Sequence, residues 1–221
     1  MSYWPWGLDY WKSGEWQVVQ ERLKDLDKKG VKWNPPRKEL FNNLRSIKRE
    51  DVKVLILGQD PYPNRRHATG IPFAIPKEEE TLPPTLVTIL NEYVADLGFP
   101  FPSNPSLSDW LFCGVLLWNV IPTCTTGASL SHQWDEYQYL TWEILDKLAT
   151  QPVVVCALGG FAASHLREKD YENFTVILTS HPSPRASKAS HNPFLGSKIF
   201  SRINTALQAD WNLEPILWKL N

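Results

Sequence analysis

A short apolar run does most to constrain the fold of this chain. Residues Val52–Leu57 are apolar except for Lys53, and the run breaks abruptly into Gly58, Gln59 and Asp60. An apolar run of this length, bounded by turn residues, predicts a β-strand buried on both faces, as in a parallel sheet. Asp60 then lies just beyond the carboxyl end of a central strand, where open α/β sheets bind ligands. For an isolated Asp, a capping role in a tight turn is the alternative.

Three more apolar runs predict strands of the same kind, at Val115–Asn119, Val153–Leu158 and Thr175–Leu178. Apolar residues at helical spacing predict the helices between and around them. These helices are expected at Gly14–Lys29, Lys38–Ile47, Leu86–Leu97 with Thr85 as its cap, Tyr137–Leu148, Phe161–Leu166 and Gly196–Leu207. Strands that alternate with helices predict an α/β fold, with a central four-stranded, mainly parallel sheet flanked by helices on both faces. Without repeats or long linkers, residues 1–221 are expected to form a single domain.

Each predicted strand is followed by a polar or glycine-rich signal at its carboxyl end. These are Gln59-Asp60, Asn119, Gly159-Gly160 and His181. The carboxyl ends of parallel strands meet at one edge of a sheet, so the four signals predict a single site there.

Composition limits the class of protein. Hydrophobic residues make up 43% of the 221 residues, and the formal net charge is −1, so nucleic-acid binding would need a local basic patch. No apolar stretch approaches the length of a membrane span, and the first residues lack the pattern of a secretory signal. The odd count of three cysteines, without metal-ligand spacing, predicts reduced thiols in a cytosolic or nuclear compartment.

Four motifs taken together resemble the uracil-DNA glycosylases of the family 1 type. They are Gly58–Tyr62, Gly70–Phe73, Leu116–Asn119 and His181–Pro184. The segments Leu82–Leu86 and Phe194–Asn204, and the C-terminal Trp218-Lys219-Leu220, extend the resemblance to nearly the whole chain, in matching order.

The resemblance implies an enzyme that flips deoxyuridine out of DNA and hydrolyses its N-glycosidic bond. It releases uracil and leaves an abasic site, as in base-excision repair. It implies no metal and no cofactor, a monomer that acts on single- or double-stranded DNA, and a protein inhibitor as a further partner at the DNA groove. We expect a cytoplasmic protein of a bacterium, virus or phage, or a nuclear one in a eukaryotic host.

By this resemblance, Asp60 and His181 are the catalytic residues. Asp60 orients and deprotonates a water and stabilises positive charge on the sugar, and His181 hydrogen-bonds the uracil O2 as negative charge develops there. A neutral imidazole that donates one N–H is sufficient for the second role. Outside this context, a histidine beside prolines is usually a structural turn residue.

The resemblance also assigns four uracil-binding residues. The Asn119 amide matches O4 and N3–H of uracil, and cytosine presents the opposite pattern at both positions. Phe73 matches the ring on which the base stacks, and Tyr62 matches the side chain that excludes the thymine methyl group. Gln59 matches a position whose backbone contacts the base. Without the resemblance, Asn119 is a cap or turn residue and Phe73 is ordinary core.

The expected DNA contacts come from loops that hold phosphates on either side of the flipped nucleotide. The cations Arg185, Lys188 and Lys198 lie close to these loops in the sequence and are expected to form a local basic patch. Taken alone, each cation is explained equally well as part of a solvated surface. The DNA-binding residues are expected to be Pro83, Pro84, Thr85, Gly159, Gly160, Ser183, Arg185 and Lys188.

The sequence departs from the family pattern at several positions. Pro63 stands where the family usually has a histidine, which puts the positioning of the water and the rate in question. His67 lies four residues further on, but the resemblance gives no reason to assign it the role of that histidine. Arg185 stands where the family inserts a leucine into the duplex, and Gly160 replaces a common serine. The segment 186–193 is a few residues longer than usual.

Two other functions are alternatives to uracil release. One is a glycosylase that prefers another 5-substituted uracil, against which Tyr62 argues, because it leaves no room for a large C5 group. The other is a DNA- or inhibitor-binding protein on a decayed glycosylase scaffold. Asp60, Asn119 and His181 argue against it, because binding alone needs no general base.

Overall fold

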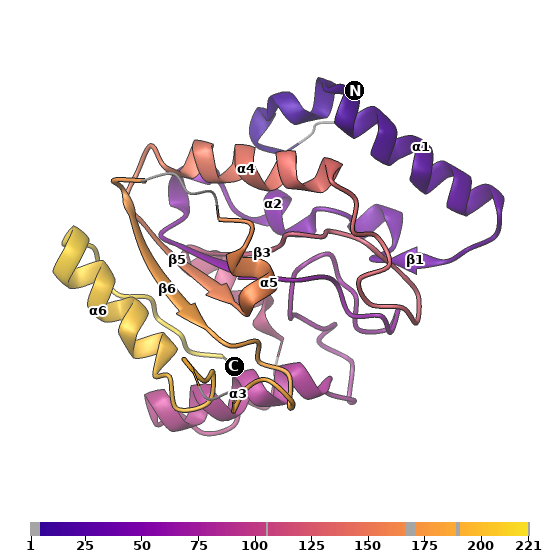
Figure 1. The fold of residues 1–221 in the computed structure, drawn as a ribbon. Helices are drawn as coiled ribbons and strands as arrows, with labels where there is room; N and C mark the ends of the chain where they lie inside the picture. The colour runs from indigo at the N-terminus through magenta and orange to yellow at the C-terminus, as the bar shows by residue number, and fades with distance from the viewer. Residues whose placement is uncertain (1–4, 105, 167–170, 189–190, 221) are drawn as a thin grey trace.

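A four-stranded parallel sheet forms the centre of the molecule (Figure 1). The computed structural model describes residues 5–104, 106–166, 171–188 and 191–220. The strands are β2 (Val54–Gly58), β3 (Val115–Asn119), β5 (Val153–Leu158) and β6 (Phe174–Thr179), in the order β3-β2-β5-β6. All three pairings are parallel, which confirms the predicted fold class.

The burial of each strand explains its pattern of apolar residues in the sequence. Every residue of β2, β3 and β5 is buried, as expected for strands covered on both faces. The edge strand β6 alternates instead, with Val176 and Leu178 exposed and Ile177 buried.

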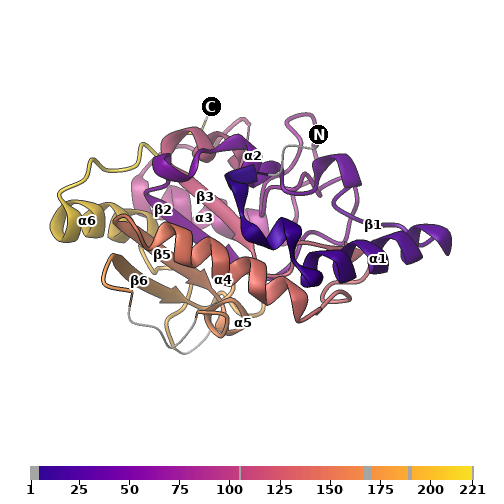
Figure 2. The same cartoon turned by 90° about the horizontal axis from the view of Figure 1, so that it is seen from above.

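Helices cover both faces of the sheet. On one face lie α1 (Gly14–Lys28), α2 (Asn42–Ser46) and α4 (Glu136–Leu148), and on the other lie α3 (Pro84–Leu97) and α6 (Ile199–Trp211) (Figures 1 and 2). The short α5 (Gly160–Ala163) follows β5 directly. The 3-10 helices within the described residues are η1 (Pro5–Gly7), η2 (Asp9–Lys12), η3 (Arg37–Glu39), η4 (Arg49–Asp51) and η5 (Leu107–Cys113).

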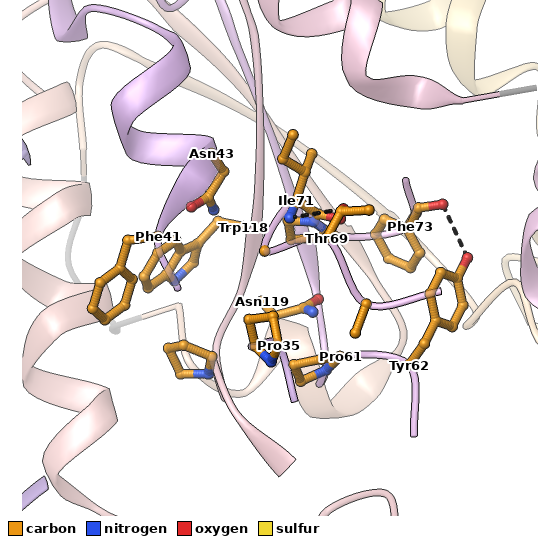
Figure 3. A pocket seen from close by; sticks show the side chains of 14 residues that line it. Pro35, Phe41, Asn43, Pro61, Tyr62, Thr69, Ile71, Phe73, Trp118 and Asn119 are labelled. Atoms are coloured by element: carbon orange, nitrogen blue, oxygen red, sulfur yellow. Dashed lines mark hydrogen bonds between the residues drawn. The ribbon is translucent and has the colours of Figure 1, made fainter. Parts of the chain in front are cut away.

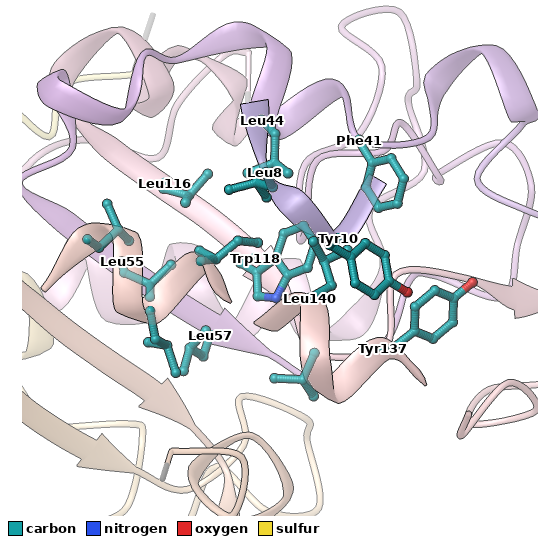
Figure 4. Close-up of a cluster of buried hydrophobic side chains, with 14 of the residues drawn as sticks. Leu8, Tyr10, Phe41, Leu44, Leu55, Leu57, Leu116, Trp118, Tyr137 and Leu140 are labelled. Carbon is teal, nitrogen blue, oxygen red and sulfur yellow. The ribbon is translucent and has the colours of Figure 1, made fainter. Parts of the chain in front are cut away.

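The sheet separates two hydrophobic clusters. In the cluster of Figure 4, Leu55 and Leu57 of β2 meet Trp118 of β3 and Leu140 of α4. The opposite cluster contains Val54 and Ile56 of β2 with residues of α3 and α6. Because successive side chains of β2 point to opposite faces, this strand lies inside both clusters, and its end is held firmly in place.

Four expected helix boundaries were wrong. The helix expected at Phe161–Leu166 is α5, which begins at Gly160 and ends at Ala163. Thr85 lies inside α3 and is not its cap, because the helix begins at Pro84 with Pro83 at the N-cap. The helix expected at Lys38–Ile47 is divided into η3 and α2, because Phe41 has a left-handed backbone with φ 65°. The last helix begins at Ile199 and continues to Trp211.

The sequence analysis missed a second, two-stranded sheet. Its strands are β1 (Trp33–Asn34) and β4 (Cys124–Thr125), which pair antiparallel. Two-residue strands carry no detectable alternation, so only the tertiary structure reveals them. This small sheet lies beside the loop that follows β2, because the Asn34 amide Nδ2 donates to the Tyr62 and Pro63 carbonyls at 3.0 and 2.8 Å.

Candidate active site

The strand ends meet at one edge of the sheet, as the sequence predicted. Gly58 at the end of β2 is the register partner of Asn119 at the end of β3, and Leu158 of β5 is the partner of Thr179 of β6. The chain passes from β2 to β3 on one side and returns to β5 on the other. Asp60 and Gly159 therefore follow the two strands between which the strand order reverses, and ligands of open α/β sheets bind at such a point.

A pocket at this edge brings together three of the predicted uracil-binding residues. Tyr62, Phe73 and Asn119 all line it, and the Tyr62 hydroxyl donates to the Phe73 carbonyl at 3.0 Å (Figure 3). Asp60, Gln59 and His181 are not among the lining residues; they belong to the loops that follow β2 and β6. The pocket is thus lined by uncharged residues, and Asp60 is the chain neighbour of Pro61, which lines it.

The backbone around Phe73 is strained. Its φ is 61°, in a left-handed region that a bulky side chain rarely adopts. The Phe73 ring lies against the backbone of Gly58, where an added Cβ would come within 2.6 Å of the ring Cζ and would also meet the Asn119 Oδ1. Gly58 therefore allows the ring and the amide to approach each other closely.

Asn119 presents an unused hydrogen-bond acceptor. The side chain is 5% exposed, and its Oδ1 has no hydrogen-bond partner among the described residues. A buried polar atom without a partner is costly and rare in proteins. The cost is offset if a ligand in the pocket supplies a donor.

Asp60 is a half-buried carboxylate that accepts hydrogen bonds from neighbouring residues. Its Oδ2 accepts the Leu130 backbone N–H at 2.6 Å, and its Oδ1 accepts from the Gln59 side chain at 3.2 Å. Burial raises the pKa of Asp60 above its usual value, although the bonds from Leu130, Gln59 and Ser129 act in the opposite direction. Desolvation thus makes this carboxylate a stronger base than a surface aspartate, while the hydrogen bonds fix its orientation.

The geometry of His181 defines which ring nitrogen can donate. Nδ1 accepts the Ser183 backbone N–H at 3.0 Å, so in the neutral ring the proton is on Nε2. Burial lowers the pKa of His181, which favours that neutral form. Gly159 has φ 100°, and an added Cβ there would lie 2.9 Å from the His181 Cβ, so the turn after β5 packs directly on this histidine.

The predicted DNA-binding residues lie at three places in the chain: the start of α3, the start of α5 and the segment after β6. Pro83, Pro84 and Thr85 form the beginning of α3. Gly159 and the exposed Gly160 form the beginning of α5, and Ser183 and Arg185 follow β6. Arg185 and Lys188 are exposed.

Sequence reasoning missed several residues that shape the site. Asn43 lines the pocket and donates to the Leu117 carbonyl at 2.7 Å, and Asn34 holds the loop after β2. The role of Leu130 had no signal in the sequence, because only its backbone N–H contacts Asp60. Phe41, Thr69 and Trp118 also line the pocket.

Pro63, which departs from the family pattern, is held in place through its carbonyl group. Its carbonyl accepts from Asn34 Nδ2 and from the Gly127 backbone N–H at 2.9 Å. His67 is buried, packs its ring edge against Tyr62, and contacts Thr81 at 3.2 Å. It therefore supports Tyr62, and within the described residues no hydrogen bond joins it to Asp60.

Other properties of the described residues bear on the sequence predictions. Cys113, Cys124 and Cys156 are free thiols, and Cys113 is only half-buried. In the described part of the chain, no helix combines the length and apolar character that crossing a membrane requires.

Comparison with known proteins decides the family. The model of the Uracil DNA glycosylase superfamily matches residues 45–208. The chain belongs to the uracil-DNA glycosylase superfamily. A protein of Acinetobacter baylyi named uracil-DNA glycosylase is 39% identical over 189 residues, which are 85% of this chain and 78% of the relative.

Solved structures of uracil-DNA glycosylases share the fold. The mimivirus uracil-DNA glycosylase has a TM-score of 0.85 at 24% identity, and the alignment covers 96% of this chain and 85% of that one. A variant of the mimivirus UNG in complex with UGI has a TM-score of 0.86 at 24% identity, with 96% and 86% covered. The family and the fold inferred from the motifs are confirmed.

Proposed function

We propose that this chain hydrolyses the N-glycosidic bond of deoxyuridine in DNA, with Asp60 and His181 as its catalytic residues. Family membership gives the class of enzyme, a uracil-DNA glycosylase, and glycosylases are hydrolases. The observation that carries the proposal is the unpartnered Asn119 Oδ1 in a pocket shared with Tyr62 and Phe73. A flipped uracil supplies the donor that this acceptor lacks.

Asp60 acts on the water and on the sugar. As the glycosidic bond breaks, the sugar gains positive charge, and a carboxylate beside it stabilises that charge. The same carboxylate removes a proton from the attacking water. The Leu130 N–H occupies Oδ2 and the Gln59 side chain occupies Oδ1, which supports a fixed orientation of the carboxyl group, with lone pairs left on both oxygens.

His181 acts on the leaving base. Uracil departs as an anion, and a neutral imidazole stabilises it by donating Nε2–H to O2. The bond from Ser183 N–H to Nδ1 supports this tautomer, and the lowered pKa keeps the ring neutral at pH 7.

Base selection combines attraction and exclusion. The Asn119 Oδ1 accepts N3–H of uracil, and its Nδ2 donates to O4; cytosine, with an acceptor at N3 and an amino group at C4, mismatches both. The Tyr62 ring fills the space beside C5, so the methyl group of thymine is excluded by contact. The bond from Tyr62 to the Phe73 carbonyl, together with the packing of His67, keeps this ring in place.

The remaining partners belong to the same proposal. Backbone and hydroxyl groups of Thr85, Gly160 and Ser183 bind phosphates of single- or double-stranded DNA as the chain acts as a monomer. A protein inhibitor competes for this surface, by analogy with the mimivirus UNG variant solved with UGI.

The test is uracil release from labelled oligonucleotides that contain uracil, thymine or cytosine at one position, read as strand breaks after alkali treatment. The wild-type chain is expected to cleave only the uracil substrate. Asp60→Asn is expected to lose roughly 100- to 10,000-fold in rate, the range for loss of a general base. Asp51→Asn, an exposed aspartate at the opposite end of β2, is the matched control and keeps the wild-type rate.

The outcomes separate the competing functions. No release from any substrate by the wild-type chain would contradict the proposal and favour a DNA-binding protein on this scaffold. Faster release of a 5-substituted uracil than of uracil would favour the altered glycosylase, which the volume of Tyr62 argues against.

A further inference from the structure

A second, open groove lies directly beside the base pocket. Ala68 lines both hollows, so the groove and the pocket lie next to each other. Pro63, the residue that departs from the family pattern, lines the groove, together with the cations Lys38, Arg65 and Arg66. None of these three cations has a place in the function proposed above.

Arg65 and Arg66 lie on a part of the chain that hydrogen bonds hold in place. Arg65 donates from Nη1 to the Trp33 carbonyl at 2.8 Å, and the Arg66 backbone N–H donates to the Asn64 side chain at 3.0 Å. The two bonds from Asn34 hold the preceding residues, Tyr62 and Pro63. The Arg65 guanidinium and the backbone of Arg66 are therefore held in place before any ligand arrives, which lowers the entropy lost on binding.

The charges in the groove are only partly compensated. Glu39 also lines it, and its carboxylate lies 3.8 Å from the Lys38 Nζ. Glu79 lies close enough to Arg66 to interact with it, but its carboxylate already accepts hydrogen bonds from Thr81. The Lys38 side chain is 84% exposed, and both arginines are exposed, so all three remain accessible to an anion.

We propose that this groove, with Lys38, Arg65 and Arg66, binds backbone phosphates of the DNA strand that flank the nucleotide in the base pocket. The proposal rests on the proposed function, because it takes the pocket as the place of the flipped base. A strand whose base occupies the pocket continues over the neighbouring surface, and the shared Ala68 places the groove next to the pocket. Arginine and lysine side chains are the usual ligands of DNA phosphates.

The test compares two double variants with the wild-type chain. Lys38→Ala/Arg66→Ala removes the two cations whose side chains make no backbone hydrogen bond in the described structure. Lys48→Ala/Lys147→Ala removes the same charge near the amino edge of the sheet, away from the site. Binding of a fluorescent duplex without uracil is measured by anisotropy from 50 to 200 mM salt, and kcat and KM are measured with a uracil-containing duplex.

We expect the groove variant to bind duplex DNA roughly tenfold more weakly or worse near 0.1 M salt, and the slope of log K against log salt to become shallower by about 2. KM rises in parallel, kcat stays within about twofold, and the control variant behaves as wild type. Equal binding and equal salt slopes for both variants would overturn the proposal. Because binding is measured without uracil, a wild-type chain that releases no uracil would refute the proposed function and leave the result on the groove intact.

Discussion

The base pocket and the neighbouring groove share a wall but differ in their physics. Tyr62, Phe73 and Asn119 are neutral at pH 7 and held by packing and hydrogen bonds, whereas the groove presents exposed lysine and arginine. Contacts in the pocket act over short range and depend on shape, while the charges in the groove act over longer range and are screened by salt. Under the two proposals, recognition of the base and retention of the strand are separable, because the pocket selects the base and the groove holds the strand.

Among the variants that test this comparison, the largest loss of activity is expected from Gly58→Ala, which crowds Phe73 and Asn119. Gly58→Ala places a Cβ against the Phe73 ring and the Asn119 amide, so both must move. We expect kcat/KM for uracil release to fall about 100-fold, and the free energy of unfolding to fall by about 1–3 kcal/mol. DNA affinity measured by anisotropy should stay near that of wild type.

Gly14→Ala is the control for this substitution, because an added Cβ there meets no atom within 4 Å. A Gly58→Ala chain with normal kcat/KM would show that Phe73 and Asn119 do not need their present positions.

A smaller effect is expected from opening the pocket at Tyr62. Tyr62→Ala removes the ring beside C5 and its bond to the Phe73 carbonyl. We expect release of thymine to become detectable, and kcat/KM for uracil to fall roughly tenfold. Product analysis on duplexes that carry T in place of U measures this change, and continued rejection of thymine would place the selection elsewhere.

The sequence predicted the sheet and the edge at which the site lies, because β2, β3 and β5 are uniformly buried and each is a plain apolar run. Family motifs led to Tyr62, Phe73 and Asn119, which the structure places around one pocket. Other features could not be predicted. The contact of Asp60 with Leu130 is made by a backbone N–H, which carries no side-chain signal.

The hydrogen bonds from Asn34 to the loop after β2 could not be predicted either. They join residues about 28 positions apart, and Asn34 belongs to a strand of only two residues. The groove was missed because Lys38 and Arg66 are distant in sequence, and exposed cations are common on any surface. The long-range contacts that assemble these features depend on packing and not on a local pattern.

The loop that contacts Asp60 through Leu130 also contains a buried histidine, His132, whose titration should affect stability. His132 is buried and contacts Thr123 Oγ1 at 2.8 Å and Thr125 Oγ1 at 3.1 Å, just beyond Leu130 in the chain. Burial lowers the pKa of His132 to about 4, below the value of about 6.5 expected in the unfolded chain. Below pH 6.5 the unfolded chain therefore binds more protons at this residue, and folding loses stability as the pH falls toward 4.

From pH 7 to 5 the contribution of His132 to this loss is about 2 kcal/mol. Urea unfolding of wild type and His132→Gln at both pH values measures it, because the variant lacks the titrating ring. The variant should lose less stability than wild type over this interval. An identical loss in both proteins would show that His132 is not held neutral.

The smallest expected effect concerns Arg185, an exposed residue that stands where the family has a leucine. Its stem and guanidinium plane can fill the space left in the stack by the flipped base. Arg185→Ala should lower kcat/KM several-fold on duplex DNA and less on single-stranded DNA. Lys24→Ala, which removes an exposed cation of α1 outside the predicted site, is the matched control. Equal losses on both substrates would reduce Arg185 to a phosphate contact.

The most direct test of the separation between pocket and groove is the salt dependence of uracil release by the wild-type chain. We predict that kcat at saturating uracil-containing duplex changes by less than about twofold between 50 and 200 mM salt. Over the same range, kcat/KM should fall steeply and linearly on logarithmic axes. A kcat that falls in parallel with kcat/KM would show that the charged surface takes part in the chemical step, and would contradict the separation.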